Sequence, residues 1–203
     1  RRQIVTEVVS GAVNHVGEDT PLGKFARTAV ELDEYFPGDP SILTALMLNR
    51  IHLRPGEALA VPPGLMHSYL SGTGIEIMAD SNNVVRGGLT DKHIDVDSLI
   101  EIVDFQTQEP WVMTAEEVDP GMRVFPGTDE QFRLWELDLD TTRPAILPAN
   151  DLARILLITG GYAVCSSPQG TDEIVRGQAA WIPAGEQVQV DGNCDGFLAA
   201  AGV

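Results

Sequence analysis

The chain contains few lysines and no long apolar run. Its 203 residues include 13 Lys and Arg against 30 Asp and Glu, for a formal net charge of −17 at pH 7, and only Lys24 and Lys92 are lysines. Nucleic acids and anionic membrane surfaces bind through clustered cations. No apolar run approaches the roughly 20 residues that span a bilayer. The composition therefore argues against nucleic acid and membrane as partners.

The sequence also lacks a cysteine framework and an initiator methionine. Cys165 and Cys194 are its two cysteines, and their separation matches neither a zinc site nor a redox motif. We expect two reduced, buried thiols, as in a cytoplasmic protein, and a single disulfide is the alternative. The N-terminus, Arg1-Arg2, is neither a signal peptide nor led by Met. The chain is therefore expected to begin inside a longer protein.

The first 48 residues differ in pattern from the rest. Their apolar side chains recur at helical spacing and predict two or three short helices, the last of them capped by Asp39 or Ser41. After Asn49 short β-type runs alternate with Gly and Pro turns. Residues 95–104 have leading acids and an apolar stripe, which predict one further helix. Strands are expected at 50–53, 58–61, 68–70, 74–79, 132–139, 154–159, 162–166, 179–182, 187–190 and 197–201.

Two segments of the β-rich region resemble each other. Residues 54–64 and 176–185 each contain a Gly turn, a strand and an apolar-Pro-x-Gly turn, with Gly56 and Gly64 in one copy and Gly177 and Gly185 in the other. This order is similar to the second motif of a cupin barrel, so two barrels of related build are predicted. Chance similarity between two hairpins rich in glycine and proline is the alternative.

His67 has the setting of a metal ligand. It lies three positions after Gly64, whereas the equivalent position of the second copy holds Val188. A neutral imidazole fixed on a strand is a good zinc or iron ligand, so only the first barrel is predicted to bind metal. A structural hydrogen bond is the alternative role. The other three histidines show no His-x-His or His-Glu-x-x-His spacing, so we expect no complete metal site within this chain.

A carboxylate and two cations follow His67. Glu76 lies in an apolar run that predicts a buried strand, and Arg86 and Lys92 lie in the polar loop after it. A carboxylate in such a strand, with cations shortly after it, suits proton transfer beside an anionic substrate. An ion pair between Glu76 and Arg86, closing one end of the barrel, accounts for the same spacing.

Four stretches between residues 46 and 105 carry a family resemblance: Pro63-Gly-Leu-Met-His-Ser-Tyr-Leu70, Gly74-Ile-Glu-Ile-Met-Ala79, Asn83-Val-Val-Arg-Gly-Gly-Leu-Thr90 and Lys92-His-Ile-Asp-Val96. Together they are similar to the signature segment of the type I mannose-6-phosphate isomerases. One departure is Asn82, where the family commonly has Asp. Because an amide is not a base, no catalytic role is expected for Asn82.

The resemblance implies a mainly β fold with two cupin-type (jelly-roll) barrels and an N-terminal helical segment. Residues 1–48 would form the helical segment. Residues 49–105 would form the main part of the metal-site barrel, whose remainder would belong to a missing N-terminal half of the same enzyme. Residues 106–203 would form a second, metal-free barrel.

The resemblance also implies a function, the interconversion of mannose 6-phosphate and fructose 6-phosphate by zinc-assisted proton transfer through a cis-enediol. At matching positions His67 would bind the single zinc, Arg86 and Glu76 would be catalytic, and Lys92 and Tyr69 would bind substrate. The other zinc ligands would lie in the N-terminal half, so the fragment alone is expected to be inactive. The alternative is a cupin module that binds a sugar phosphate without catalysis.

Overall fold

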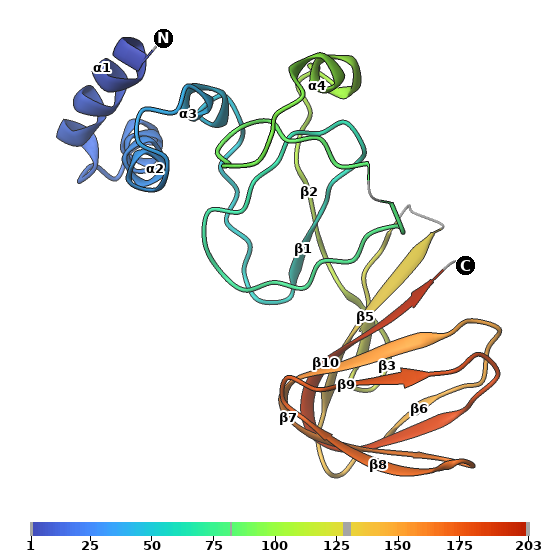
Figure 1. The fold of residues 1–203 in the computed structure, drawn as a ribbon. Coiled ribbons are helices and arrows are strands. Elements are labelled where there is room, and N and C mark those ends of the chain that lie inside the picture. The colour runs from blue at the N-terminus through green and yellow to red at the C-terminus, as the bar shows by residue number, and fades with distance from the viewer. Residues whose placement is uncertain (1, 82, 128–130, 202–203) are drawn as a thin grey trace. The chain divides into compact units, whose positions relative to one another are not determined.

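The computed structural model describes residues 2–81, 83–127 and 131–201 (Figure 1). They form two compact units, each of which is described on its own. The first consists of Arg1–His52, Val61–Thr73 and Asn82–Pro110, and the second of Leu53–Ala60, Gly74–Ser81 and Trp111–Val203. The division that the sequence suggests, near residues 48 and 105, stays a prediction.

The first unit contains the helices. They are α1 (Arg2–Ala12), the 3₁₀ helix Val13–His15, α2 (Pro21–Tyr35), α3 (Ser41–Ala45) and α4 (Val96–Ile102). Thr20 caps α2 because its hydroxyl accepts the Gly23 N–H at 3.1 Å, and Pro21 occupies the first helical position. Ahead of α3 the Asp39 carboxylate accepts the Ser41 N–H at 2.8 Å. The predicted helical segment and the helix near residue 100 are confirmed.

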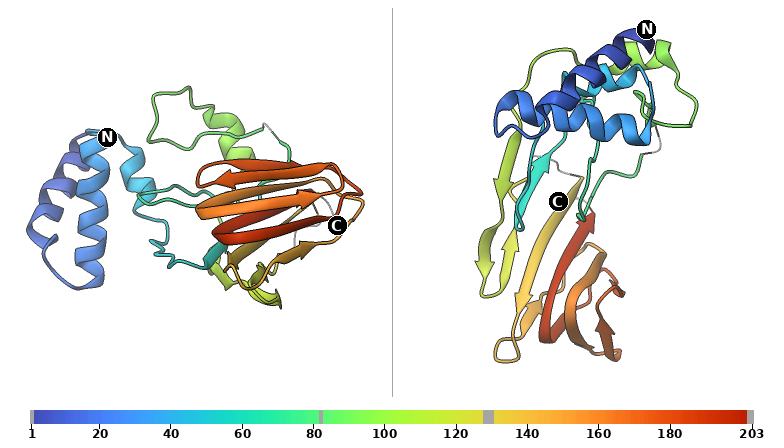
Figure 2. Two further views of the ribbon diagram at one scale, coloured as in Figure 1. Left: turned by 90° about the horizontal axis from the view of Figure 1, so that it is seen from below. Right: turned by 90° about the vertical axis from the view of Figure 1, so that its left-hand side faces the viewer.

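A hydrophobic cluster joins the first three helices, with α1 and α2 side by side (Figure 2). Its buried members are Val5 of α1, Leu32 of α2 and Ile42 of α3. Burying three branched side chains stabilises short helices that propensity alone would leave marginal. We call these three residues and the side chains packed on them the helix cluster; the packed side chains are Val9, Leu43, Ala45, Leu46, Leu70 and Leu89.

The second unit is built from antiparallel sheets. β1 (Glu57–Ala60) pairs with β2 (Trp111–Thr114). The remaining strands are β3 (Glu116–Asp119), β4 (Met122–Val124), β5 (Phe132–Leu139), β6 (Ala145–Leu147), β7 (Arg154–Ser167), β8 (Gly170–Val175), β9 (Ala179–Ile182) and β10 (Val188–Ala201). They form one sheet in the order β3-β4-β5-β10-β7-β8, with β6 also paired to β10 and β9 to β7.

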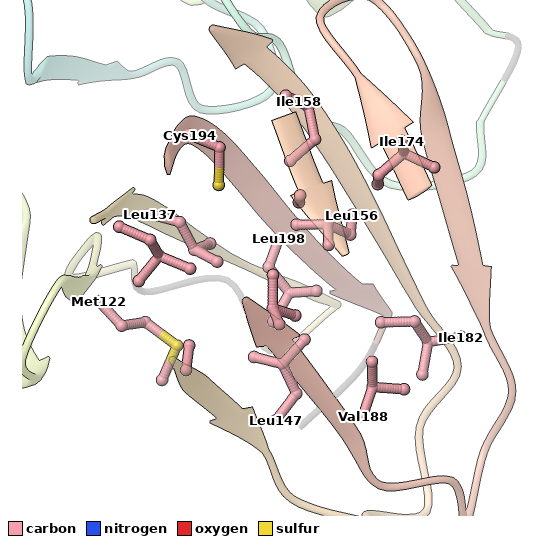
Figure 3. Packing of buried hydrophobic residues seen from close by; sticks show 14 residues of the cluster. Met122, Leu137, Leu147, Leu156, Ile158, Ile174, Ile182, Val188, Cys194 and Leu198 are labelled. Atoms are coloured by element: carbon pink, nitrogen blue, oxygen red, sulfur yellow. The ribbon is translucent and has the colours of Figure 1, made fainter. Parts of the chain in front are cut away.

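The core of this sheet follows from strand alternation. Every second residue of β10 from Val188 to Ala200 is buried, and the residues between them are intermediate or exposed. Side chains such as Leu137, Leu156 and Leu198 gather on the inner face (Figure 3). The mainly β, antiparallel character is therefore confirmed. Within the described residues the strand order does not close into a barrel, so the two barrels stay a prediction.

Glycines let two strands run further than expected. The predicted strands 154–159 and 162–166 are one strand, β7, and those at 187–190 and 197–201 are both part of β10. Gly161 has φ +65°, and a Cβ there would overlap the Asn193 carbonyl oxygen. A residue without a side chain thus keeps β7 paired with β10 where any other residue would separate them.

Three predicted strands are absent from the described part of the chain. Residues 50–53, 68–70 and 74–79 form no strand. A strand requires a neighbour for its N–H and C=O groups, and apolar alternation cannot supply one. Ile75 and Met78, expected inside a buried strand, are 38% and 54% exposed, and Glu76 between them is exposed as well. The expectation of a buried carboxylate at Glu76 was wrong for this chain.

The internal repeat is present in the backbone. Gly56, Gly64, Gly177 and Gly185 all have φ between +80° and +86°. The Glu57 N–H donates to the Arg54 carbonyl at 2.9 Å, and the equivalent bond, from Gln178 to Val175, is also 2.9 Å. In the second turns, bonds from residue 65 to 62 and from 186 to 183 are both 3.3 Å. Matching turns at both ends of matching strands favour a true repeat over chance similarity.

A buried arginine holds the second copy in place. Arg154 is 2% exposed and donates to the carbonyl oxygens of Pro148 at 2.9 Å and Glu186 at 2.5 Å. The Gly185 N–H also donates to the Asn150 carbonyl at 2.7 Å. Since a buried guanidinium requires acceptors, these bonds fix the turn that leads into β10.

No helix among the described residues is long and apolar enough to cross a membrane. Both cysteines are free thiols, as predicted, with Cys194 buried and Cys165 partly so. Burial raises the pKa of the Cys165 thiol to about 11, and it raises the pKa of the Cys194 thiol too.

We predict that both thiols react slowly in the native protein. Alkylation requires the thiolate, and a pKa near 11 makes that form roughly a hundredfold rarer at pH 8 than a pKa of 9.0 would. Iodoacetamide labelling of Cys165 at pH 8, followed by mass spectrometry, should therefore be at least about a hundredfold slower in buffer than in concentrated urea, and labelling of Cys194 should also be slower in buffer. Equal rates would show that the thiols are accessible and unperturbed.

Candidate functional site

The turn before His67 is tied to the end of α4. The Gly64 carbonyl accepts the Asp104 N–H at 3.0 Å, directly after that helix. Gly64 has φ +83°, and a Cβ there would lie 2.9 Å from the Ile102 carbonyl oxygen. Only glycine therefore fits at this position, which explains why the turn preceding His67 contains it.

The two ring nitrogens of His67 differ in their surroundings. Its Nδ1 lies 3.0 Å from the Leu65 carbonyl oxygen, and the side chain is exposed. A carbonyl only accepts hydrogen bonds, so Nδ1 carries the proton and Nε2 keeps its lone pair. Metal-binding histidines commonly use this arrangement, in which a backbone carbonyl sets the tautomer. The ring also meets Tyr69 edge to face, with centroids 6.3 Å apart.

The segment that carries Arg86 packs against the segment that carries His67. A Cβ at Gly87 would lie 2.6 Å from the terminal methyl group of Met66. The backbone beside Arg86 thus lies against the end of the side chain of Met66, the residue before His67. Gly88, with φ +137°, approaches α3 so closely that a Cβ there would overlap the Ser41 hydroxyl. The structure therefore brings the two predicted site segments together inside the first unit.

Lys92 lies in an ordered loop between Arg86 and α4. Its backbone N–H donates to the Thr90 hydroxyl at 3.1 Å, and its side chain is exposed, as is that of Arg86. At the end of the loop Asp95 caps α4 by accepting the Ser98 N–H at 3.1 Å and the Ser98 hydroxyl at 2.7 Å. These hydrogen bonds lower the pKa of the Asp95 carboxyl.

Glu76 belongs to the second unit, whereas His67, Tyr69, Arg86 and Lys92 belong to the first. The two explanations of the spacing between Glu76 and Arg86, catalysis and an ion pair, therefore both stay predictions. Asn82 lies outside the described residues.

The donors for a metal ion are few. Across residues 2–81, 83–127 and 131–201 no group of three or more His, Cys, Asp or Glu side chains could hold one. Within these residues His67 is therefore not part of such a group, and its role as a metal ligand stays a prediction. The close approach at Gly87 and Gly88 was not predicted from the sequence; the available signal was a glycine pair directly after a candidate arginine.

Comparison with known proteins identifies relatives. No protein-family model matches the chain. Mannose-6-phosphate isomerase 1 of Arabidopsis thaliana is 28% identical over 177 residues, 87% of this chain and 41% of the relative. Mannose-6-phosphate isomerase of Salmonella typhimurium is 33% identical over 178 residues, 86% of this chain and 44% of the relative. The chain is a relative of the mannose-6-phosphate isomerases. The family resemblance found in the sequence is thereby confirmed.

A solved structure agrees with this relationship. The crystal structure of mannose 6-phosphate isomerase from Salmonella typhimurium bound to substrate and zinc covers 100% of this chain, with a TM-score of 0.77 and 25% identity. This chain covers 49% of that one. The chain thus spans about half the length of the mannose-6-phosphate isomerases that it matches.

We predict that Gly88→Ala destabilises the first unit. The substitution places a Cβ against Ser41 and imposes a left-handed φ on alanine, which should cost about 1–3 kcal/mol. Urea unfolding followed by circular dichroism at 222 nm reports on this unit, because all the described helices belong to it. Gly17→Ala is the matched control, since Gly17 has open space around it. Equal midpoints for the two variants would contradict the proposed packing.

Proposed function

We propose that this chain forms the C-terminal half of a mannose-6-phosphate isomerase, a zinc enzyme that interconverts mannose 6-phosphate and fructose 6-phosphate. The observation that carries the proposal is the packing of the Arg86 segment against the His67 segment, in a chain whose relatives bear that name. The N-terminal half, outside these 203 residues, would supply the other zinc ligands. A cytoplasmic location belongs to the same proposal and is supported by the free thiols.

The spacing between His67 and Arg86 along the chain supports their assignment to the site of a mannose-6-phosphate isomerase. Two solved structures of the Salmonella protein are variants in which a histidine and an arginine are replaced by alanine. These two residues are as many positions apart in that protein as His67 and Arg86 are here. Other variants replace two lysines and a glutamate that lie earlier in the Salmonella protein than the histidine. This chain has too few residues before His67 to contain their equivalents at the same spacing. The spacing supports a site divided between two halves.

The repeated turns support the finer fold proposal. If both copies belong to jelly-roll barrels, β9 and its flanking turns mark one barrel and β1 with its turns marks the other. The barrel marked by β9 would be metal-free because Val188, which stands where His67 would be, is buried at 4% exposure. The barrel marked by β1 would need strands from the N-terminal half.

Each site residue has a chemical task in this proposal. Zinc, when bound, would polarise the sugar oxygens as a Lewis acid. His67 would hold one side of the ion through Nε2. Arg86 would stabilise the negative charge that develops on the enediol oxygen, through its forked donors. Glu76 would take the proton from one of the two sugar carbons, C1 or C2, and return it to the other. Lys92 would meet the phosphate, and Tyr69 would line the pocket.

A sugar-phosphate-binding module without catalysis is the second candidate. The observation that favours it is that the described residues hold no complete metal-binding group. The mass of the native gene product distinguishes the two. A product of about twice 21.9 kDa supports the isomerase, and a native product of 21.9 kDa supports the module.

We predict that Arg86→Ala, made in the longest gene product that contains these residues, lowers kcat by roughly 100-fold to 1000-fold because a transition-state charge loses its donor. Zinc content should be unchanged, since arginine is not a ligand. A coupled assay of fructose 6-phosphate formation and metal analysis measure both. Arg54→Ala, which removes another exposed arginine, is the control and should retain activity. Full activity of the Arg86 variant would remove its catalytic role.

We predict separately that His67→Ala reduces bound zinc in the same gene product. Losing one of four ligands lowers zinc affinity steeply, so metal analysis after dialysis should show most of the zinc gone. His52→Ala, at another exposed histidine, should keep its zinc. If the His67 variant also retained full zinc, His67 would have only its structural hydrogen bond to Leu65.

A further inference from the structure

Two leucines connect the candidate site to the helices. Leu70 lies three positions after His67, and Leu89 lies three positions after Arg86. Both pack on the helix cluster, whose buried members are Val5, Leu32 and Ile42. His67 and Arg86 are therefore each followed, three positions later, by a leucine that packs on the helix cluster.

The backbone of Leu89 shows that this contact is not incidental. Leu89 has φ +51°, and it is the one residue other than glycine with a positive φ in the described part of the chain. A branched side chain in the left-handed region is disfavoured and persists only where the surroundings hold it. The packing of Leu89 against the helix cluster is the interaction that offsets this strain.

The glycines before Leu89 determine how the loop reaches its anchor. Without a side chain, Gly87 lies against Met66 and Gly88 lies against Ser41 at the start of α3. Between Arg86 and Leu89 the chain is thus confined by the His67 segment, by α3 and by the helix cluster. The side chain of Arg86 is exposed, whereas the three residues that follow it have close neighbours in these parts.

We propose that Leu70 and Leu89 are positioning residues, which hold the His67 and Arg86 segments in register on the helix cluster. The helical segment then serves as the platform of the site. The proposal rests on the proposed function only for the roles of His67 and Arg86; the anchoring itself can be tested on this chain without any activity.

The first experiment measures loop opening in the 203-residue chain. Trypsin cuts after Arg86 and Lys92, on either side of Leu89, and cleavage of a folded loop follows its local opening. Leu89→Ala should speed cleavage at these two bonds about tenfold, and Leu89→Met should restore the slow rate. The Arg176-Gly177 bond in the second unit is the internal control, and its rate should not change. An unchanged rate at Arg86 and Lys92 in Leu89→Ala would overturn the proposal.

The second experiment uses the longest gene product with mannose 6-phosphate as substrate. Leu89→Ala should lower kcat about tenfold with KM and zinc content little changed, and Leu89→Met should recover activity. Leu70→Ala should lower zinc retention at dialysis. Leu43→Ala is the matched control, because Leu43 packs on the same cluster but follows neither site residue.

The outcomes separate the two proposals. If Leu43→Ala lowered kcat as much as Leu89→Ala, the cluster would act only through stability and the positioning role would be overturned. If the unsubstituted gene product had no isomerase activity, the proposed function would fail, while the trypsin rates would still decide whether Leu89 anchors the loop.

Discussion

A β-strand exists only beside a partner that satisfies its backbone N–H and C=O groups, and the architecture of this chain depends on that constraint. β10 has partners on both sides, β5 and β7, and forms the centre of a large sheet. Residues 68–70 and 74–79 have comparable β propensity but form no strand, and apolar side chains such as Met78 are exposed. The segments that carry His67 and Arg86 must therefore be held by other means. The turn bonded to α4, the glycine contacts and the helix cluster provide them.

The two copies of the repeat share one backbone conformation but differ in the residue that follows the second turn. Both have left-handed glycines and the same turn hydrogen bonds. In the second copy Arg154 and Asn150 hold the turn, and Val188 begins β10 inside the core. In the first copy His67 occupies the matching position and is exposed, with Nδ1 engaged by a carbonyl. A buried valine contributes packing energy, whereas an exposed imidazole with a directed lone pair contributes none and suits a ligand.

Sequence reasoning succeeded where the signal is local. The cap Asp95 and the stripe after it specify α4, the bounds of β5 and β9 follow from alternation, and the four glycines of the repeat adopt the expected turns. It failed where the outcome depends on distant partners. β2, β3, β4, β6 and β8 were missed, and the break expected at residues 160 and 161 is absent because β7 continues through them. Nor does any local pattern distinguish Leu89 from other leucines, because its role comes from the buried side chains of α1, α2 and α3, which lie more than forty residues earlier in the chain.

The net charge of −17 is compatible with an anionic ligand because electrostatic fields in water are short-ranged. At physiological ionic strength the Debye length is about 8 Å, so carboxylates elsewhere on the surface are largely screened from a phosphate in contact with a cation. Among the described residues the ion pairs of arginine involve Arg50 and Arg123, and both lie outside the candidate site. Neither Arg86 nor Lys92 is among these ion pairs, so under the proposed function both charges would be available to the phosphorylated substrate. Because such cations act by contact rather than by long-range attraction, their effect depends on their position. Under the proposed function, a loop that holds Arg86 in place would therefore contribute more to substrate binding than additional positive charge would.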